Sequence, residues 1–259
     1  FKGVRMITLL SPSKKLNFKH QDAVSAFTQC DFIESAQELV NKAKNLTSQD
    51  LKDLMKISDS LADLNKERFN NWSLPFNQDN AKQAILAFDG GVYSGLQAET
   101  FNQNDLDFAQ DHIRILSGLY GVLKPLDLIQ PYRLEMGTKF ENAKGKNLYD
   151  FWCSEVTNNL NANIKKHENK TIINCSSNEY FSVIDQKNLD GNILNTVFKE
   201  YRDDELKFIS FNAKKARGLL AKFLIDNKIT NKNDLKDFNL ENYKFDSLLS
   251  DDSTFIFTR

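Results

Sequence analysis

The chain has 259 residues, of which 41% are hydrophobic and 27% are charged, and its formal net charge at pH 7 is −1. This composition excludes wholesale disorder and a globally basic nucleic-acid binder, although a local basic patch is compatible with it. The 10 glycines and 4 prolines exclude collagen-like and low-complexity chains, and without an apolar run of about 18 residues we expect no membrane span.

The N-terminal half of the chain predicts short strands and amphipathic helices. Residues 1–5 precede Met6 and are expected to be an upstream extension or a cloning remnant, which leaves one domain over residues 6–259. We expect a strand over residues 6–10, a helix over 31–46, a second helix from the N-cap Thr47 to Leu64, and a strand over 84–88. Asp50 follows Thr47 by three residues, which is the spacing of a capping box.

The C-terminal half continues the alternation of helices and strands. We expect helices over residues 105–119, 146–166 and 213–227, strands over 171–175, 194–201, 207–211 and 254–258, and a short helix capped by Thr230. Because strands and helices are interspersed, the predicted class is α/β, or mixed α+β. No repeat and no Pro- or Ser-rich linker divides the chain, which indicates a single compact unit with a mixed sheet and surrounding helices.

A glycine pair within residues 113–137 is the most informative local pattern. Gly118 and Gly121 follow the predicted helix and bracket two apolar residues, which resembles the hairpin of a helix-hairpin-helix element. Glycines adopt positive φ at little cost and leave backbone N–H groups bare, and bare amides suit phosphate oxygens. Lys124 and Arg133 would add positive charge nearby. The alternative is an ordinary helix C-cap at Gly118, followed by a turn at Lys124 and Pro125.

The predicted helix near residues 213–225 is basic on one side. At about 100° per residue, four cations share one face: Lys214, Lys215, Arg217 and Lys222. Gly218 falls within that face, where it costs the helix roughly 1 kcal/mol relative to Ala. Close approach of a sugar-phosphate chain is one reason to keep a glycine there. The alternative is a solvated amphipathic helix with an incidental glycine.

Polar side chains directly follow two of the predicted strands. Ser11, Ser13 and Lys14 come after the strand over residues 6–10, and Glu179 comes shortly after the strand over 171–175. In open α/β sheets, ligands bind beyond the carboxyl ends of strands, so Ser11, Ser13 and Lys14 are candidates for binding a phosphate. Lys14 and Glu179 are the candidate catalytic residues, with Glu179 as an acid or base. The alternative is that all of them are ordinary turn residues.

Cysteine and histidine spacing gives no metal or disulfide signature. The three cysteines are widely separated and include no CxxC pair: Cys30, Cys153 and Cys175. The three histidines are equally scattered, and no HExxH pattern occurs. We therefore expect a protein of the reducing cytoplasm with no metal site and no cofactor.

Six segments of the chain resemble one known family. They are residues 7–16 (ITLLSPSKKL), 55–69 (MKISDSLADLNKERF), 84–96 (AILAFDGGVYSGL), 114–137 (RILSGLYGVLKPLDLIQPYRLEMG), 148–152 (LYDFW) and 212–218 (NAKKARG). On these segments the sequence resembles the YaaA peroxide-stress family of bacterial cytosolic proteins, over nearly the whole chain from Met6. The resemblance implies a role in surviving hydrogen peroxide and in keeping intracellular free iron low. It also implies a mixed α/β fold with a helix-hairpin-helix element and a positively charged cleft. The implied molecular function is DNA binding, without an established catalytic activity.

Two functions of different classes are therefore open. The first is a DNA-binding protein of the peroxide response, which binds duplex or structured DNA mainly through phosphates, helps to protect or repair it, and limits damage by free iron. Its expected DNA-binding residues are Gly118, Gly121, Lys124, Arg133, Lys214, Lys215, Arg217, Gly218 and Lys222, beside the phosphate-binding Ser11, Ser13 and Lys14. This hypothesis requires that the two glycine-containing stretches lie along one groove.

The second function is an enzyme that acts on a nucleotide, nucleobase or nucleic acid. It requires Lys14, Arg133, Glu179 and Lys215 to converge on one concave pocket. A third class, an iron-sequestering protein, is disfavoured because the isolated histidines and cysteines offer no ligand set.

Overall fold

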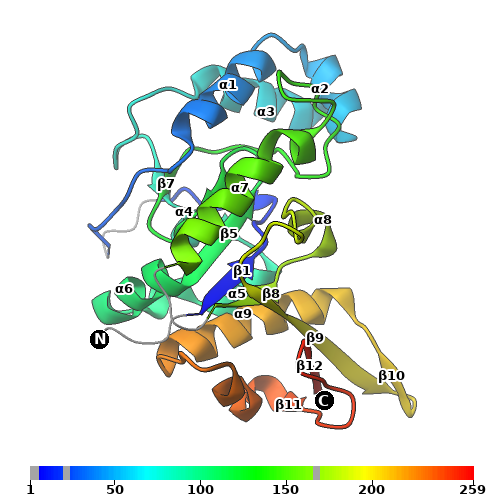
Figure 1. Cartoon of the computed structure of the whole chain (residues 1–259). Helices are drawn as coiled ribbons and strands as arrows, with labels where there is room; N and C mark the ends of the chain where they lie inside the picture. Colours follow the sequence, from blue (N-terminus) through cyan, green and yellow to red (C-terminus); the bar gives the residue numbers. More distant parts are fainter. Residues whose placement is uncertain (1–5, 20–23, 166–169) are drawn as a thin grey trace.

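A mixed β-sheet with helices on both faces forms the centre of the molecule (Figure 1). The computed structural model describes residues 6–19, 24–165 and 170–259, so the expected extension over residues 1–5 lies outside the described residues. The strand order is β11-β12-β9-β8-β1-β5-β6, and β10 pairs with β9 outside this path. The strands are β1 (Ile7–Leu10), β5 (Ile113–Ser117), β6 (Gly121–Leu123), β8 (Thr171–Cys175), β9 (Asn192–Arg202), β10 (Glu205–Lys207), β11 (Lys244–Phe245) and β12 (Thr254–Thr258).

The strand β1 is the point at which the order of the sheet reverses. It pairs in parallel with β5 on one side and with β8 on the other, and β9 runs parallel to β8. Every residue of β1, β5 and β8 is buried, as expected for parallel strands covered on both faces. In open α/β sheets, ligands bind in the crevice beyond the carboxyl ends of the strands at such a reversal.

The long helices cover the sheet. α9 (Ser210–Asp226) packs against α5 (Gly91–Leu96) and contacts β1, β8 and β9, while α7 (Leu148–Ile164) packs against β6. The other helices are α1 (Ile33–Ala43), α2 (Ser48–Met55), α3 (Asp59–Asn71), α4 (Ala84–Ala87), α6 (Gln103–His112) and α8 (Asn178–Phe181), with 3-10 turns at Ala98–Thr100, Lys232–Asp237 and Leu240–Asn242. Two short pairs complete the fold: β2 (Lys15–Leu16) with β4 (Phe88–Asp89), and β3 (Lys82–Gln83) with β7 (Leu128–Ile129). The expected mixed α/β class and single compact unit are confirmed.

Local signals located several elements correctly. The Asp50 amide donates to Thr47 Oγ1 (3.1 Å) and the Thr47 amide donates to the Asp50 carboxylate (2.8 Å), so the predicted capping box starts α2. The strands predicted over residues 171–175 and 254–258 are β8 and β12. The helix predicted from Thr47 to Leu64 is nevertheless two helices, because Lys56 adopts a left-handed conformation (φ 52°) that ends α2 and Ser58 then caps α3.

The helix predicted over residues 105–119 is wrong in its second half. α6 ends at His112, and the apolar residues that follow form β5, which is buried between β1 and β6. β5 and β6 form an antiparallel hairpin in which Ser117 pairs with Gly121. The glycine pair therefore belongs to a β-hairpin and not to a helix-hairpin-helix element. A continuous apolar run fits a buried strand as well as a buried helix, and neighbouring strands decide between them.

Three shorter predictions are also wrong. Residues 84–88 form the helix α4 and only the start of β4, instead of one strand. The strand predicted over 207–211 ends at Lys207, since Ser210 already begins α9. Asn231, rather than Thr230, caps the short turn that follows α9. Within the described ranges, no helix combines the length and apolar character needed to cross a bilayer.

Candidate phosphate-binding site

A concave pocket of about 400 Å³ lies beyond the carboxyl ends of β1 and β8, where the sheet order reverses. It is lined by residues 11–15 after β1, residues 132–135, residues around α8, and the facing parts of α5 and α9. Its charged residues are five cations and two carboxylates: Lys14, Lys15, Arg133, Lys214, Arg217, Glu135 and Glu179. A concave site with this excess of positive charge attracts anions.

Hydrogen bonds join the loops that form the floor of the pocket. The Ser177 amide donates to Ser11 Oγ (2.8 Å), and the Tyr93 hydroxyl donates to the Ser11 carbonyl oxygen (3.0 Å). The Ser13 hydroxyl donates to the carbonyl oxygen of Asp89. The two serines predicted to bind phosphate therefore line the pocket, and their hydroxyls also tie β1 to its neighbours.

Glu135 holds two of the pocket cations in place. Its carboxylate lies 3.2 Å from an Nη of Arg133 and 2.5 Å from Nζ of Lys14. Glu179 Oε1 accepts a hydrogen bond from the Gly137 amide (3.0 Å), which fastens the segment that carries Arg133 and Glu135. Lys14, Arg133 and Glu179, which the sequence singled out separately, therefore converge on one pocket.

Lys214 and Arg217 are the pocket cations that no carboxylate of the described residues neutralises. Nε of Arg217 is buried and has no hydrogen-bond partner among these residues, and burial lowers the pKa of the guanidinium. Burying an unpaired charged group is costly unless an opposite charge or hydrogen bonds compensate for it. A bound anion supplies both.

The donor set suits a phosphate group in particular. A guanidinium presents a planar fork of N–H donors that matches phosphate oxygens, and a lysine ammonium adds a compact positive charge. Lys214 and Arg217 are one turn apart on α9, so both reach the same side of the helix. The arrangement can hold an anion at the carboxyl end of β1 without a metal or cofactor.

Three other predicted cations do not line this pocket and are neutralised elsewhere. Their ion pairs are Lys215 with Glu241, Lys222 with Asp226 (3.2 Å), and Lys124 with Asp31 (2.8 Å). The basic face predicted for α9 is therefore divided, because only Lys214 and Arg217 turn toward the pocket.

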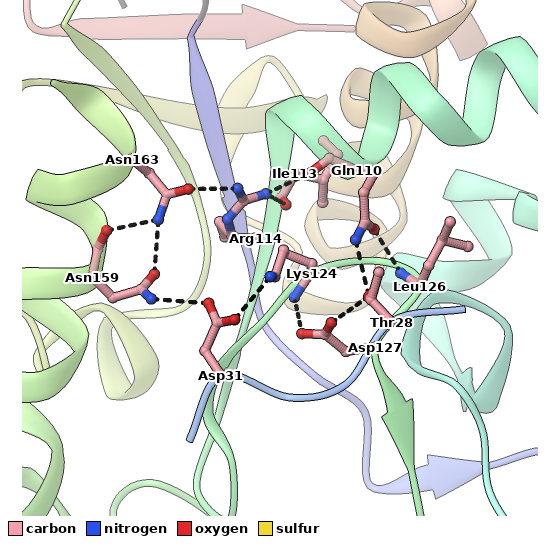
Figure 2. Close-up of polar contacts among 10 residues, drawn as sticks. All are labelled: Thr28, Asp31, Gln110, Ile113, Arg114, Lys124, Leu126, Asp127, Asn159 and Asn163. Atoms are coloured by element: carbon pink, nitrogen blue, oxygen red, sulfur yellow. Dashed lines mark hydrogen bonds and ion pairs between the residues drawn. The ribbon is translucent and has the colours of Figure 1, made fainter. Parts of the chain in front are cut away.

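Lys124 belongs to a separate polar network, which Figure 2 shows. Asp31 accepts hydrogen bonds from Lys124 (2.8 Å) and from Asn159 (3.1 Å), and Arg114 of β5 donates to Asn163 (2.9 Å). Lys124 follows β6 at the position opposite Arg114, near the start of β5. This network therefore closes the amino end of β5, whereas the pocket lies beyond the carboxyl ends of the strands.

Gly118 and Gly121 are buried, so the exposed main chain on which their predicted contact with a polynucleotide depended is absent at these two residues. A Cβ on Gly118 would lie 2.1 Å from the Leu134 carbonyl oxygen, and a Cβ on Gly121 would lie 2.7 Å from the ring of Trp152. The Trp152 indole N–H also donates to the Gly118 carbonyl oxygen (2.9 Å). The hairpin is covered by α7 and by the chain that leads into the pocket.

Gly218 serves the contact between two helices. A Cβ at this position would lie 1.8 Å from the Val92 carbonyl oxygen in α5, and a Cβ on Gly95 would lie 2.2 Å from the Lys215 carbonyl oxygen in α9. The close approach expected at Gly218 exists, but α5 makes it rather than a sugar-phosphate chain. Gly118, Gly121 and Gly218 are therefore covered by the protein itself and none of them lines the pocket, although cations from both glycine-containing stretches do.

Sequence reasoning missed Glu135 and could not separate Lys214 from Lys215. Arg133 and Glu135 are two residues apart, the spacing that puts side chains on one side of an extended segment, and this signal could have found the pair. Nothing local distinguishes the two lysines, since the partner of Lys215 is Glu241, far along the chain.

The cysteines are poorly suited to reaction with peroxide. Burial raises the pKa of Cys175 to about 11, and it also raises the pKa values of Cys30 and Cys153. Because the thiolate is the reactive form, we expect the folded chain to lose free thiols to hydrogen peroxide at pH 7 more slowly than free cysteine, and faster once urea unfolds it. Timed thiol titration measures both rates. A folded-state thiol that outpaces free cysteine would contradict this expectation.

The sheet and its pocket define the chain as an α/β protein with a basic pocket at the reversal point of the sheet. A family model described as peroxide stress protein YaaA matches residues 6–249. The chain is 49% identical over 254 residues to a UPF0246 protein of Saccharophagus degradans (98% of this chain, 99% of the relative) and 50% identical over 240 residues to one of Pseudoalteromonas translucida (93% of each). A UPF0246 protein of Paraburkholderia xenovorans is 48% identical over 256 residues (98% of each). The chain therefore belongs to the YaaA peroxide-stress family, as its motifs indicated.

Proposed function

We propose that the chain binds DNA during peroxide stress and that the pocket beyond β1 holds a phosphate of the DNA backbone. Arg217 carries this proposal, because its buried Nε has no partner among the described residues and no carboxylate there neutralises it. Membership of a peroxide-stress family supports the biological setting. Since phosphate contacts position a protein without reading bases, we expect binding that depends little on sequence and falls steeply with salt.

Two adjacent lysines provide a matched test. Lys214 lines the pocket, whereas Lys215 is paired with Glu241. We expect Lys214→Ala and Arg217→Ala each to weaken DNA binding roughly tenfold or more, which is the strength of a charge-assisted hydrogen bond. Each should also reduce the slope of log affinity against log salt by about one. Fluorescence anisotropy with a labelled oligonucleotide over a salt series measures both quantities.

Lys215→Ala is the control for that experiment, and we expect it to change affinity less than twofold. The proposal fails if Lys214→Ala and Arg217→Ala bind DNA as the parent does, or if all three variants weaken it equally. The second result would place the contact on a diffuse basic surface instead of in the pocket.

The size of the pocket supports a second candidate, an enzyme that acts on a nucleotide or nucleic acid. About 400 Å³ is within the range of small-molecule sites. Lys14, Arg133 and Glu179 line it as that hypothesis required, although Lys215 does not. Incubation of the chain with nucleoside monophosphates and with oligonucleotides, followed by chromatography, tests for this activity. A product that the parent forms and Glu179→Gln does not would support the enzyme. Unchanged substrates would exclude an enzyme that acts on these two substrate classes.

Neither candidate includes an iron site. In the part of the chain that the structure describes, no three His, Cys, Asp or Glu side chains are grouped so that they could hold a metal ion. An effect on free iron would therefore be indirect under both candidates.

A further inference from the structure

A protruding hairpin extends from the sheet next to the candidate site. β9 pairs with β8 only as far as Asn195, and it continues to Arg202, where it turns back into β10 (Figure 1). Asp203 and Asp204 both adopt positive φ, as a tight two-residue hairpin turn requires. Because β9 passes the carboxyl end of β8, the hairpin projects at the same edge of the sheet as the pocket.

Three exposed aromatic rings lie on this hairpin and on the start of α9. Tyr201 is 56% exposed, Phe208 is 52% exposed and Phe211 is 74% exposed. Tyr201 is paired with Leu206 across the hairpin, so their side chains lie on the same face. Phe208 follows Leu206 by two residues, and residues two apart in an extended chain lie on the same face, so Phe208 is on the face of Tyr201. We call Tyr201, Phe208 and Phe211 the aromatic arm. Leaving three large rings in water is unfavourable, which indicates a surface that is covered by a ligand.

The aromatic arm is continuous with the pocket. Phe211, Lys214 and Arg217 recur every three residues along α9, so each side chain neighbours the next on the helix surface. Residues 206–225 contain five cations and no carboxylate. A chain molecule whose phosphate lies against Arg217 and Lys214 therefore reaches Phe211 with its adjacent unit.

A nucleic acid offers two kinds of surface to such a ring. In a duplex the base faces are stacked on one another and only their edges are accessible, whereas the faces of unpaired bases are free to stack on aromatic side chains. Rings beside phosphate-binding cations are the combination that binds single-stranded nucleic acid in other proteins. Exposed rings of this kind add little to the binding of an intact duplex.

We propose that the aromatic arm stacks on unpaired bases, so that this protein binds DNA where a single strand is open, with the strand's phosphates in the pocket. The inference rests on the proposed DNA binding and adds the form of DNA that is recognised. Phe211 provides the first stacking position, next to Lys214, and Phe208 and Tyr201 provide further positions along the hairpin.

The test uses fluorescence anisotropy to measure the affinity for a labelled single-stranded oligonucleotide and for its blunt duplex. The proteins compared are the parent chain, Phe211→Ala, Phe208→Ala and Leu248→Ala. We expect Phe211→Ala to weaken single-strand binding about five- to 150-fold, the effect of losing one stacked base, and to change duplex binding less than twofold. Leu248 is 95% exposed outside the arm, so Leu248→Ala is the matched control and should change neither. Thermal unfolding of each variant confirms that it is folded.

A second variant tests stacking directly. Phe211→Trp retains an aromatic face, so we expect it to keep single-strand affinity, and its indole emission should be quenched when the oligonucleotide binds. The natural Trp72 and Trp152 are buried and serve as the background signal of the parent chain.

The outcomes separate the two proposals. If Phe211→Ala leaves single-strand binding unchanged while Lys214→Ala weakens it, the arm proposal is overturned and the phosphate pocket stands. Equal weakening of single-strand and duplex binding by Phe211→Ala also overturns it, because the ring would then act on a surface common to both. If the parent chain binds neither DNA, the proposed function itself fails.

Discussion

Gly218→Ala is expected to lower the free energy of unfolding by about 2 kcal/mol. The added methyl group would lie 1.8 Å from a backbone carbonyl oxygen of α5, and a backbone atom cannot move aside as a flexible side chain can. Overpacking costs about 1–3 kcal/mol, and this close backbone contact belongs at the upper end of that range. The gain in helix propensity offsets roughly 1 kcal/mol, which leaves a net loss of about 2 kcal/mol. Chemical denaturation in urea, followed by circular dichroism, measures the change.

The same variant distinguishes the two roles that a glycine on this helix can have. Lys214→Ala, at an exposed position of α9, is the stability control and should leave the unfolding midpoint nearly unchanged. If Gly218 were kept to admit a DNA backbone, Gly218→Ala would stabilise the chain by about 1 kcal/mol through propensity and would weaken DNA binding. That result would contradict the helix contact as the reason for the glycine.

Asp127 is expected to make stability fall as pH rises from about 4 to about 6. Its side chain is fully buried in the network of Figure 2, where it accepts hydrogen bonds from Thr28 Oγ1 (2.5 Å) and the Lys124 amide (2.8 Å). Burial raises its pKa from 3.8 to about 6, against the opposing effect of these hydrogen bonds. The folded state therefore binds more protons than the unfolded state in this window, and raising the pH through it removes stability.

The magnitude follows from the size of the shift. A shift of about two pKa units corresponds to roughly 2–3 kcal/mol. Because pH 4 already lies slightly above the unfolded pKa, Asp127 contributes about 2 kcal/mol less to stability at pH 7 than at pH 4. Asp127→Asn resembles the protonated acid and does not titrate. We expect the stability of Asp127→Asn relative to the parent to rise by about 2 kcal/mol between pH 4 and pH 7, as measured by urea unfolding at each pH.

Asp63→Asn is the control for that series, because Asp63 is exposed on α3. Its stability relative to the parent should stay nearly constant with pH. If Asp127→Asn also showed a constant difference, the buried carboxyl would titrate near its unfolded value. That result would contradict the raised pKa of Asp127. It would mean that the positive charges of Arg114 and Lys124 stabilise the ionised carboxylate enough to cancel the effect of burial.

The two ends of the sheet differ in whether their cations are paired within the chain. At the amino end of β5, the cations Lys124 and Arg114 are met by carboxylates and amides of the chain itself. At the carboxyl end of β1, Lys214 and Arg217 are not neutralised by any described carboxylate. The first arrangement stabilises the fold, and the second is suited to a ligand.

Several local elements and the polar residues at the strand ends were predictable from local patterns in the sequence. Thr47 and Asp50 encode a cap through contacts three residues apart, and the isolated apolar runs at 171–175 and 254–258 have the length and β-branched or aromatic content of strands. Ser11, Ser13, Lys14 and Glu179 were recognisable as strand-end polar residues, and they do line the pocket or its floor.

Which glycines are accessible and which cations are unpaired could not be predicted, because both depend on long-range contacts. The apolar run at 113–117 becomes a strand because β1 and β6 supply its hydrogen bonds, and Gly118 and Gly218 are covered by Leu134 and α5, which are distant in sequence. Lys215 is neutralised by Glu241 while Lys214 faces the pocket. Strand pairing, ion pairing and burial depend on contacts between segments that are far apart along the chain, and the spacing of neighbouring residues does not predict such contacts.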